Sequence, residues 1–499
     1  MNLNELLAGV PVSKMFQTVF GKMASTHDVM VSGIQYDSRK VQRGGMFVAL
    51  RGGVADGHKF IGDAIQKGVK VVVTEDDANP PDSLCMHTGT VKLVVDDSRR
   101  TLALLSANFF GRPADRLKII GVTGTNGKTT TVHLIKQMLE SNPAFKVGSI
   151  GTIDYRIGHE EVIPSTHTTP ESLELHSLFS RMVQAGCTHA VMEVSSHSLA
   201  QQRVHGIRFR AAVFTNLTQD HLDYHGTMDQ YLEAKKILFD ELPPDAAAIV
   251  NADSPYTERI TASTRARIVR YGIGPSYGAF GALHVALTRE GFTAEIDGQQ
   301  IETRLSGLFN VQNFCAAYAA VKCVEPACAL TPDVIAKLEP ASGRFEQFHS
   351  QKGWTVIVDY AHTPDAITNC LQAIRDSIVP QAGADASVTI VFGAGGDRDT
   401  KKRPLMGRAA EELSDRVIVT SDNPRTEDPR AIIDQVLAGM AHPERATIEP
   451  DRRKAIELAL TRARKGEIIL LAGKGHEDYQ VIGTEKIHLS DKELVRQLL

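Results

Sequence analysis

The sequence is poor in the features that mark disulfide-bonded, zinc-binding or membrane proteins. Its 499 residues include six cysteines, and no two are spaced as CxxC. Scattered cysteines of this kind indicate buried reduced thiols rather than a disulfide framework or a zinc site. No apolar run reaches the roughly 18 residues of a membrane-spanning helix, and the N-terminus MNLNELLAGVPVSKMF lacks the basic start and apolar stretch of a signal peptide. We therefore expect a cytoplasmic protein that has no membrane partner.

An excess of basic charge is also lacking. The formal net charge is −4, so bulk charge gives no support for a nucleic-acid partner, and none is expected. The apolar share of 42% and the charged share of 23% are typical of a globular chain. A chain of this length is too long for one ordinary core, which predicts about two to four domains.

Short apolar runs alternate with amphipathic segments, a pattern that favours an α/β architecture with mostly parallel sheets. The predicted strands are 46–50, 70–74, 91–95, 117–122, 189–194, 211–215, 247–250, 355–359, 388–392, 416–420 and 467–471. A boundary is predicted near residue 98, before a helix, and another near 340, in the Pro/Gly/Ser stretch KLEPASGRF. The predicted domains are therefore 1–98, 99–340 and 341–499.

The stretch IIGVTGTNGKTT, residues 119–130, predicts a strand, a glycine-rich turn and a helix over 129–140. Glycines let backbone amides curl around phosphate oxygens, and the helix N-terminus favours negative charge. Lys128 is then placed to meet the β- and γ-phosphates of ATP, and the Thr129 hydroxyl to ligate Mg²⁺. The alternative is a plain strand–turn–helix, since the GxxxxGK[ST] pattern needs glycine where this chain has Val122.

The variant TGTNGKT[TS] resembles the phosphate loop of the Mur ligase family, which includes folylpolyglutamate synthase. The resemblance implies an enzyme that activates a carboxylate with ATP as an acyl phosphate, which an amine then attacks. It also implies that ATP is held by the loop residues Gly124, Thr125, Asn126, Gly127, Lys128, Thr129 and Thr130.

Two polar segments follow predicted strands. In VMEVSSH, Glu193 would be a solvated charge on its own, but beside a phosphate loop it suits the oxygen-ligand chemistry of Mg²⁺. The segment TNLTQDHLDYHGT, 215–227, is rich in Asp and His; it could be a polar loop, and its spacing is unconvincing for zinc. The resemblance places His221 near the metal.

A lysine on the next helix, DQYLEAKKILFDEL, is predicted to point inward. At 100° per residue, Lys235 lies about 45° from the centre of the apolar face, whereas Lys236 lies about 145° away and reads as an ordinary solvated lysine. A buried lysine is costly unless its charge is paired or its pKa is lowered, and a neutral amine can take up CO₂ to form a carbamate. The alternative is a side chain that snorkels along the helix. The resemblance favours the carbamate (N6-carboxylysine), which would support Mg²⁺ and count with Lys128, Glu193 and His221 among the catalytic residues.

Hydroxyls, an amide and an arginine gather in STHTTP, 165–170, and SSHSLAQQRV, 195–204. Each residue alone could be ordinary surface polarity, but together they fit an acceptor that carries carboxylates. The resemblance assigns the UDP-sugar dipeptide to Thr168, Thr169, Ser195, Gln201 and Arg203. The segment YDSRKVQRGGMFVALRGGVADGHKFI, 36–61, resembles the UDP-binding opening of Mur ligases that add the third and fourth peptide residues, with Ser38 as the uridine or diphosphate contact. Folylpolyglutamate synthase lacks this domain, so the presence of the segment argues against that member of the family.

Other expected ATP contacts follow from the resemblance alone. These are Asn310 and Asn313 in LFNVQN, near the adenine, together with Arg344 in GRFE and Asp359 in DYAHTPDA.

Three late strands end in polar loops: GAGGDRD, SDNPR and AGKGHEDY. Loops at the carboxyl ends of parallel strands gather at one edge of a sheet. Arginines suit carboxylates, and Asp, Asn and Glu suit an ammonium group, so these loops predict an amino-acid ligand. The expected contacts are Arg398, Asp422, Asn423, Pro424, Arg425, Gly473 and Glu477. The DNPR signature resembles that of family members that add meso-2,6-diaminopimelate, and Arg425 is placed to pair with the distal carboxylate that lysine lacks.

The resemblance therefore implies an α/β protein of three domains: an N-terminal UDP-binding α/β domain, a central P-loop ATPase-like domain with a mostly parallel sheet, and a C-terminal Rossmann-like α/β domain. The implied reaction joins meso-2,6-diaminopimelate to UDP-N-acetylmuramoyl-L-alanyl-D-glutamate in peptidoglycan synthesis, with Mg²⁺ as cofactor and ATP as co-substrate. We expect the chain to be a monomer. Two alternatives stay open: a sister ligase that adds lysine, and a P-loop ATP switch or binding module without ligase activity.

Overall fold

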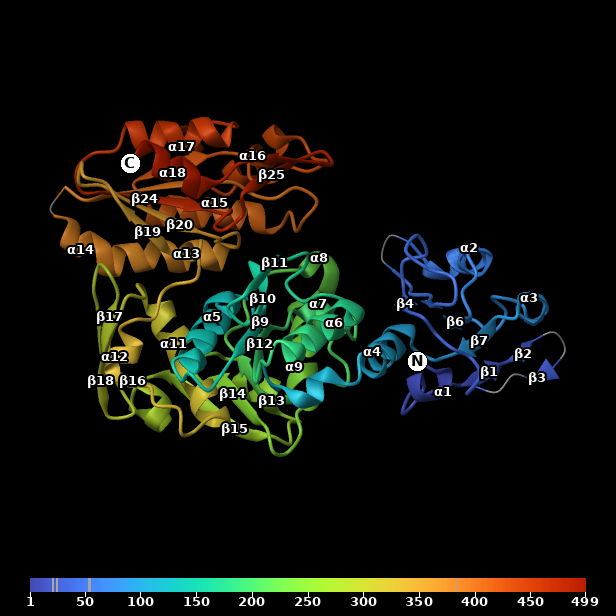
Figure 1. Ribbon diagram of the computed structural model, residues 1–499. Coiled ribbons are helices and arrows are strands. Elements are labelled where there is room, and N and C mark those ends of the chain that lie inside the picture. Colours follow the sequence, from blue (N-terminus) through green and yellow to red (C-terminus); the bar gives the residue numbers. More distant parts are fainter. Residues whose placement is uncertain (20–21, 24–25, 53–54, 384) are drawn as a thin grey trace.

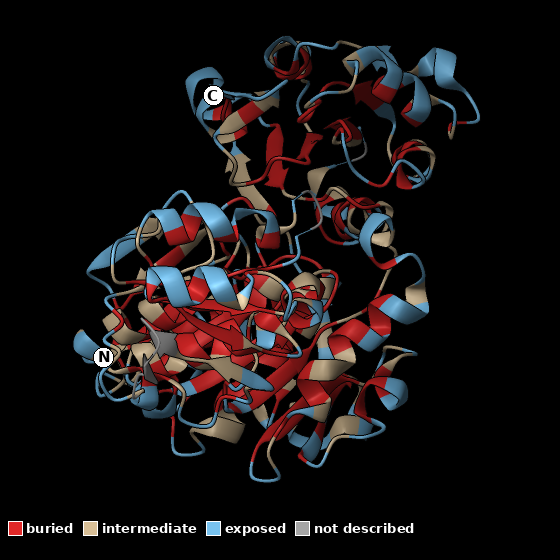
Figure 2. Cartoon of the chain, turned by 90° about the vertical axis from the view of Figure 1, so that its right-hand side faces the viewer, coloured by how far each residue is buried: buried red, intermediate tan, exposed pale blue. Residues whose placement is uncertain are grey.

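The computed structural model describes residues 1–19, 22–23, 26–52, 55–383 and 385–499. Of the N-terminal segment 36–61, Gly53 and Val54 lie outside the described residues. Figure 1 shows three α/β bodies, with the central one between the other two and α4 leading into it from the N-terminal body. Each body has its own sheet and its own buried apolar cluster, which Figure 2 shows along the strands. The predicted three-domain α/β class is confirmed.

The N-terminal body is built on a five-stranded sheet of order β1-β7-β6-β5-β4, parallel except for β1. Val71–Thr74 and Val91–Val94 are fully or nearly fully buried, because helices cover them. Its elements are α1 (Leu3–Leu6), β1 (Lys14–Phe16), β2 (Thr18–Val19), β3 (Lys22–Met23), β4 (Ile34–Gln35), β5 (Met46–Val48), η1 (Gly57–Phe60), α2 (Ile61–Gln66), β6 (Val71–Thr74), α3 (Asp82–Thr88), β7 (Val91–Val94) and α4 (Ser98–Phe109).

Helix α4 begins where the sequence predicts a boundary. Asp97 caps it by accepting hydrogen bonds from the amides of Arg99 and Arg100. Its buried Leu102 and Leu105 belong to the N-terminal apolar cluster, together with Leu173 of α6 (Ser172–Gln184) in the central body.

The central body holds an eleven-stranded sheet of order β11-β10-β9-β12-β8-β13-β14-β15-β16-β17-β18. Its middle strands are parallel, and antiparallel hairpins form both edges, so the sheet is mostly parallel as predicted. Its elements are η2 (Pro113–Arg116), β8 (Lys118–Thr123), α5 (Lys128–Glu140), β9 (Val147–Ile150), β10 (Asp154–Ile157), β11 (Glu161–Pro164), α6, β12 (His189–Glu193), α7 (Ser196–Ala200), β13 (Phe209–Phe214), α8 (Leu222–His225), α9 (Met228–Asp240), β14 (Ala247–Asn251), α10 (Thr257–Thr261), β15 (Arg267–Ile273), η3 (Pro275–Phe280), β16 (Gly281–Leu287), β17 (Phe292–Ile296), β18 (Gln299–Thr303), α11 (Leu308–Val324) and α12 (Pro332–Ile335).

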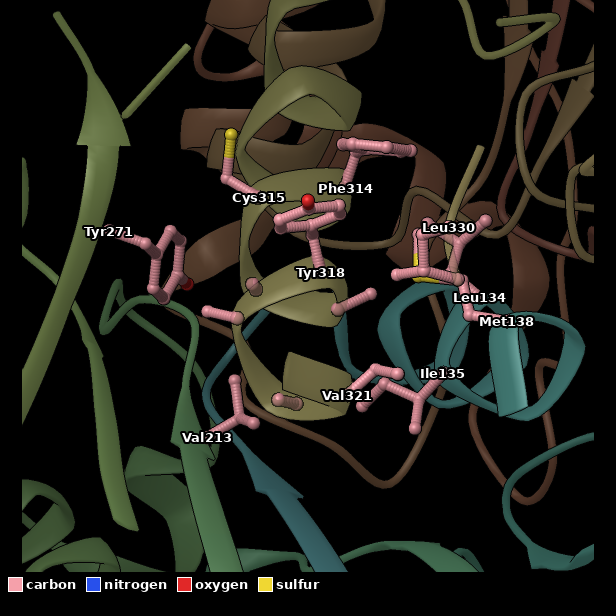
Figure 3. Close-up of a cluster of buried hydrophobic side chains, with 14 of the residues drawn as sticks. Leu134, Ile135, Met138, Val213, Tyr271, Phe314, Cys315, Tyr318, Val321 and Leu330 are labelled. Carbon is pink, nitrogen blue, oxygen red and sulfur yellow. The ribbon is translucent and has the colours of Figure 1, made fainter. Parts of the chain in front are cut away.

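Helices α5 and α11 pack together on one face of this sheet. Figure 3 shows Leu134, Ile135 and Met138 of α5 directed at Val321 and Leu330, while Tyr271 and Val213 of the sheet approach α11. Helix α11 carries apolar residues around most of its surface, which suits its buried position between α5 and the strands. This packing fixes α5, and with it the loop at its N-terminus.

The C-terminal body has a six-stranded sheet of order β19-β20-β24-β21-β22-β23, parallel except for β19. Because β20, β24, β21 and β22 run in the same direction, their following loops lie at one edge. Its elements are β19 (Glu346–His349), β20 (Thr355–Asp359), α13 (Pro364–Ala373), η4 (Ile374–Ile378), α14 (Val379–Ala382), β21 (Ser387–Phe392), α15 (Lys402–Leu413), β22 (Arg416–Val419), α16 (Pro429–Leu437), η5 (Pro443–Arg445), β23 (Thr447–Ile448), α17 (Arg452–Thr461), β24 (Glu467–Ala472), β25 (Tyr479–Ile482), β26 (Glu485–His488) and α18 (Asp491–Leu498).

All six cysteines are free, five buried and Cys323 half-buried, which confirms the prediction of buried reduced thiols. Within the described ranges, no helix combines the length and the apolar character that crossing a membrane requires.

Candidate active site

A cavity of about 450 Å³ lies between the central and C-terminal bodies. The loop between β8 and α5 lines it from below, and residues after β20 together with α13 line it from the other side. Figure 1 shows α13 facing the central body at this place. Among the predicted ATP and metal residues, those that line the cavity are Thr125, Asn126, Gly127, Lys128, Thr129, Thr130, Glu193, His221, Lys235, Asn310, Asn313, Arg344 and Asp359.

The glycine-rich loop is packed so closely that side chains are excluded. A Cβ at Gly124, where φ is +147°, would lie 1.9 Å from Thr215 Oγ1, and one at Gly127, where φ is +85°, would lie 2.4 Å from Asn313 Oδ1. Asn313 of α11 therefore rests directly on the loop, and its amide donates to Asn310 Oδ1 at 3.1 Å. Both asparagines belong to the loop's support in this arrangement.

Glu193, at the end of β12, is the centre of an oxygen-rich cluster. Its Oε1 accepts hydrogen bonds from Thr129 Oγ1 at 2.9 Å and from the Thr152 amide at 2.8 Å. The Thr152 hydroxyl donates to Oε2 at 3.0 Å. Arg344, from the C-terminal body, donates to Thr129 Oγ1 at 2.9 Å and lies over the Tyr360 ring. Two carboxylate oxygens and a hydroxyl held in this way are donors that Mg²⁺ prefers.

Lys235 of α9 points inward as predicted: it is 1% exposed, and its Nζ donates to Gly124 O at 2.8 Å. Burial lowers the pKa of Lys235 well below its ordinary value, and the nearby Lys128 ammonium lowers it further. In the described part of the chain, no carboxylate lies within ion-pair distance of Lys235 Nζ. The prediction that Lys236 is an ordinary solvated lysine is wrong. Its side chain is 12% exposed, because it folds back onto Asp240 at 2.5 Å and Ser263 at 3.0 Å.

Histidines gather beside Lys235. The rings of His197 and His221 lie 4.9 Å apart, and those of His197 and His225 lie 5.4 Å apart. Burial lowers the pKa of His221 to about 3 and that of His225 to about 4, so both rings are neutral near pH 7. Across the described residues, no three His, Cys, Asp or Glu side chains are gathered into a metal site of their own.

The predicted acceptor residues of the central body form one hydrogen-bonded group. Thr169 Oγ1 donates to Glu193 O at 2.9 Å and lies 3.4 Å from Ser195 Oγ. Arg203 donates to Thr169 O and to Gln201 Oε1, both at 2.7 Å. Thr168 contacts Thr152 at 3.1 Å, which joins the group to the Glu193 cluster.

Glu171 was not found from the sequence, yet its carboxylate lies 2.8 Å from Arg203 Nε and 3.8 Å from Arg99 Nη1 of α4. Ser38 is not brought to the acceptor group. It lies in a turn of the N-terminal body, where its carbonyl accepts from Lys67 Nζ at 2.7 Å.

The three polar loops of the C-terminal body converge as predicted. Arg425 Nη1 donates to Gly396 O at 2.7 Å, and a Cβ at Gly395 would meet both Arg425 and Arg398. A Cβ at Gly396 would lie 1.9 Å from Pro424 O, so the two loops touch backbone to backbone. Asp422 lies against Gly473, where an added Cβ would be 2.7 Å from its carboxylate.

A buried lysine that sequence reasoning missed organises this convergence. Lys474, 0% exposed, donates to Asn423 Oδ1 at 3.2 Å and to Glu477 Oε2 at 2.9 Å, and lies 3.8 Å from Asp422. Asn423 in turn donates to Glu477 at 3.0 Å and accepts from the Val481 amide at 2.9 Å. Its position in the GKGHE stretch, between the predicted contacts Gly473 and Glu477, could have pointed to Lys474 from the sequence.

A chain of contacts joins the two halves of the site. Thr125 Oγ1 of the phosphate loop donates to Thr218 O at 3.1 Å, two residues before Asp220. Asp220 is 5% exposed and pairs with Lys402 of α15 at 3.4 Å. Lys402 follows the loop that carries Arg398, and in this loop the carbonyl of Gly396 accepts a hydrogen bond from Arg425. Neither Asp220 nor Lys402 was singled out from the sequence.

Comparison with known proteins agrees with this geometry. Three family models match in chain order: Mur ligase family, catalytic domain, at residues 30–110; Mur ligase middle domain at 122–321; and Mur ligase, glutamate ligase domain, at 343–475. A relative from Chlorobaculum tepidum, named UDP-N-acetylmuramoyl-L-alanyl-D-glutamate–2,6-diaminopimelate ligase, is 47% identical over 479 residues, covering 93% of this chain and 91% of the relative. A relative of the same name from Cytophaga hutchinsonii is 42% identical over 474 residues, covering 95% of each.

Solved structures give the same picture. A structure described as UDP-N-acetylmuramoyl-L-alanyl-D-glutamate–2,6-diaminopimelate ligase superposes with a TM-score of 0.67 at 31% identity, covering 100% of this chain and 98% of that one. A crystal structure of MurF from Acinetobacter baumannii superposes with a TM-score of 0.64 at 18% identity, covering 100% and 98%, and shares the fold.

Proposed function

The chain belongs to the Mur ligase family, and from this premise we propose that it joins meso-2,6-diaminopimelate to UDP-N-acetylmuramoyl-L-alanyl-D-glutamate in peptidoglycan synthesis. The reaction is ATP-dependent amide formation. The observation that carries it is the 47% sequence identity, over 93% of the chain, to a relative whose name states this activity, with the DNPR stretch present in this chain. The converged arginines and carboxylates after β21, β22 and β24 support an amino-acid pocket.

The proposed chemistry uses ATP held at the loop 124–130, with Asn310, Asn313, Arg344 and Asp359 around it. The γ-phosphoryl group passes to the glutamate side-chain carboxylate, held by the Thr169–Arg203 group, to give an acyl phosphate. The amine of diaminopimelate attacks, and the tetrahedral intermediate collapses to amide and phosphate. Lys128 and Arg344 are cations placed to stabilise the charge that develops.

We propose that Thr129, Glu193, His221 and Lys235 hold Mg²⁺. The fit is supported by the Glu193 cluster, in which a hydroxyl and both carboxylate oxygens are already oriented within 3.0 Å of their partners. When bound, Mg²⁺ neutralises phosphate charge.

Lys235 is proposed to be carbamylated, and its environment supports this. CO₂ reacts with a neutral amine, and a lowered pKa makes the neutral form available at neutral pH. The product is an anion, which would suit a site that holds Lys128 and a metal.

Further assignments complete the proposal. The diaminopimelate contacts are Arg398, Asp422, Asn423, Pro424, Arg425, Gly473 and Glu477, with Arg425 on the distal carboxylate, and Ser38 contacts the uridine diphosphate. The proposed domains are 1–98, 99–340 and 341–499, with helix α4 joining the first domain to the second. We also propose that the chain acts as a monomer.

One assay tests the function. ADP release is followed with the UDP-sugar dipeptide present while diaminopimelate or lysine is titrated. We expect release that requires both substrates and that saturates at far lower diaminopimelate than lysine. Equal use of lysine would indicate the lysine-adding sister ligase, and release that ignores every amine would indicate an ATP switch.

A further inference from the structure

The reaction proposed above leaves one requirement without a residue. The attacking amine is an ammonium ion near neutral pH, and it has no lone pair until it loses a proton. A base is therefore expected in the cavity that the phosphate loop and the C-terminal body line together, and it must hold a free lone pair. This inference rests on the proposed function.

His362 meets the requirement for a free lone pair. It follows β20, lines the cavity, and its side chain is 37% exposed. Its Nδ1 lies 2.8 Å from Tyr360 O. Because a carbonyl oxygen only accepts, the neutral ring carries its proton on Nδ1, and Nε2 keeps its lone pair. The Tyr360 ring, 4.7 Å away and edge-on, helps to hold the imidazole in this orientation.

A buried carboxylate stands ready to stabilise the protonated ring. Asp220 Oδ2 lies 3.9 Å from His362 Nε2, and this carboxylate comes from the central body while His362 comes from the C-terminal body. Asp220 is itself fixed by the His221 amide at 3.0 Å and by Lys402 at 3.4 Å. The pair lies on the contact chain that joins the phosphate loop to the Arg398 loop.

Burial, with help from two nearby cations, keeps His362 neutral before substrates bind. Burial lowers the pKa of His362 to about 4, helped by Lys402 and Arg344 and opposed by Asp220 and the Tyr360 carbonyl. Phosphoryl and carboxylate groups of bound substrates add negative charge here, which raises the pKa toward the range where a base works well.

Neighbouring groups are unsuited to the task. Lys474 has three acceptors around it and no lone pair while charged. Burial and the Glu477 carboxylate raise the pKa of Tyr360, so its hydroxyl stays protonated. Glu477 already accepts from Asn423 and Lys474.

We infer that His362 is the general base of the ligase, with Nε2 taking a proton from the incoming ammonium group. The freed amine attacks the acyl-phosphate carbon and forms the C–N bond. The bond between this carbon and the bridging oxygen then breaks, and that oxygen leaves with phosphate. Of the two ammonium protons lost, one resides on His362 as imidazolium beside Asp220, and the other leaves on phosphate as HPO₄²⁻. The imidazolium returns its proton to solvent after the products leave.

The test separates deprotonation from every other step by changing the nucleophile. Hydroxylamine is largely neutral near neutral pH, so it traps the acyl phosphate as a hydroxamate without a base. His362→Gln keeps a donor for the Tyr360 carbonyl but has no basic nitrogen. We expect amide formation with diaminopimelate to fall about 100-fold, and hydroxamate formation to stay within about threefold. Amide formation by the variant should also rise about tenfold per pH unit, following deprotonation of the free amine.

Controls make each outcome decisive. His488→Gln removes an exposed histidine of the same body, paired with Glu493 at 2.7 Å, and should leave both products unchanged. Hydroxamate formation shows that a variant is folded and still activates the carboxylate. If His362→Gln does not fold, His362→Asn is tested in its place. Equal loss of amide and hydroxamate in folded protein, or unchanged amide formation, would overturn the role of His362 while leaving the ligase function intact. Failure of the wild-type chain to form either product would overturn the function itself, and the inference with it.

Discussion

At the scale of single residues, two lysines compete for one oxygen. Lys128 Nζ lies 3.0 Å and Lys235 Nζ 2.8 Å from the carbonyl of Gly124. Two ammonium ions this close repel each other, and burial lowers the pKa of both. Converting Lys235 into a carbamate would replace this repulsion with attraction.

The first prediction concerns this lysine. Lys235→Ala should reduce kcat by about 100-fold, because a metal-supporting anion is lost. Acetate or bicarbonate should restore part of the activity by filling the space with a small carboxylate. Lys236→Ala, one residue along the same helix, is the matched control and should stay within twofold of wild type. Normal turnover by Lys235→Ala would contradict the carbamate.

The second prediction concerns amine choice. Arg425→Ala should leave the distal carboxylate of diaminopimelate unpaired, at a cost of about 2–5 kcal/mol, which is a rise in KM of roughly 30-fold or more. Steady-state kinetics with diaminopimelate measure this. Arg430→Ala, which removes an exposed arginine paired with Asp434 at 3.0 Å, is the control. An unchanged KM for diaminopimelate would show that Arg425 does not bind the distal carboxylate.

Local sequence allowed Arg425 and Lys235 to be singled out because one lies in a motif and the other interrupts a helical apolar face. Asp220, Lys402 and His362 gave no such signal. Each is a polar residue in a polar stretch. Their interaction becomes visible only in the folded protein, where Asp220 of the central body lies within 3.9 Å of His362 and Lys402 of the C-terminal body.

At the scale of elements, the predicted strands were found because buried parallel strands are continuous apolar runs. The edge hairpins β10–β11 and β16–β18 were not predicted, since half-exposed strands such as Glu161–Pro164 carry mixed residues. The contact between loop 393–399 and loop 421–425 was predicted from topology alone, because parallel strands fix where their loops end.

The third prediction concerns an element joint that supports this edge. Arg452 at the start of α17 and Asp491 at the start of α18 are both 0% exposed and pair at 2.6 Å, and Arg452 also donates to Ala472 O at the end of β24. Arg452→Ala would leave the buried Asp491 carboxylate without its ion-pair partner and should lower the free energy of unfolding by about 3–5 kcal/mol. Denaturant unfolding measures it. The exposed neighbour provides the control: Arg453→Ala should change stability by less than about 0.5 kcal/mol, and equal losses would contradict the argument.

At the scale of the whole molecule, the site is shared between bodies. Asn126 of the phosphate loop donates to Asp365 of α13 at 2.7 Å, and Arg344 reaches Thr129 from the C-terminal side. The site therefore draws on residues of both bodies, and we expect closure of the two bodies to be part of catalysis.

The fourth prediction follows from this closure. Asp365→Ala removes a hydrogen bond that exists only when the bodies meet, so kcat/KM for ATP should fall about two- to tenfold, the equivalent of roughly 0.5–1.5 kcal/mol. Asp434→Ala, in the same body but away from the cleft, should leave kcat/KM unchanged. A similar loss in both variants would point to general destabilisation instead.

The most direct test of the acyl-phosphate mechanism follows an ¹⁸O label from the acceptor carboxylate to the phosphate product. If ATP activates the acceptor carboxylate, a glutamate side chain labelled with ¹⁸O passes one labelled oxygen to phosphate for each amide formed. We predict this transfer with diaminopimelate as the amine. Phosphate that carries no label from the carboxylate would contradict an acyl phosphate between the two halves of the site.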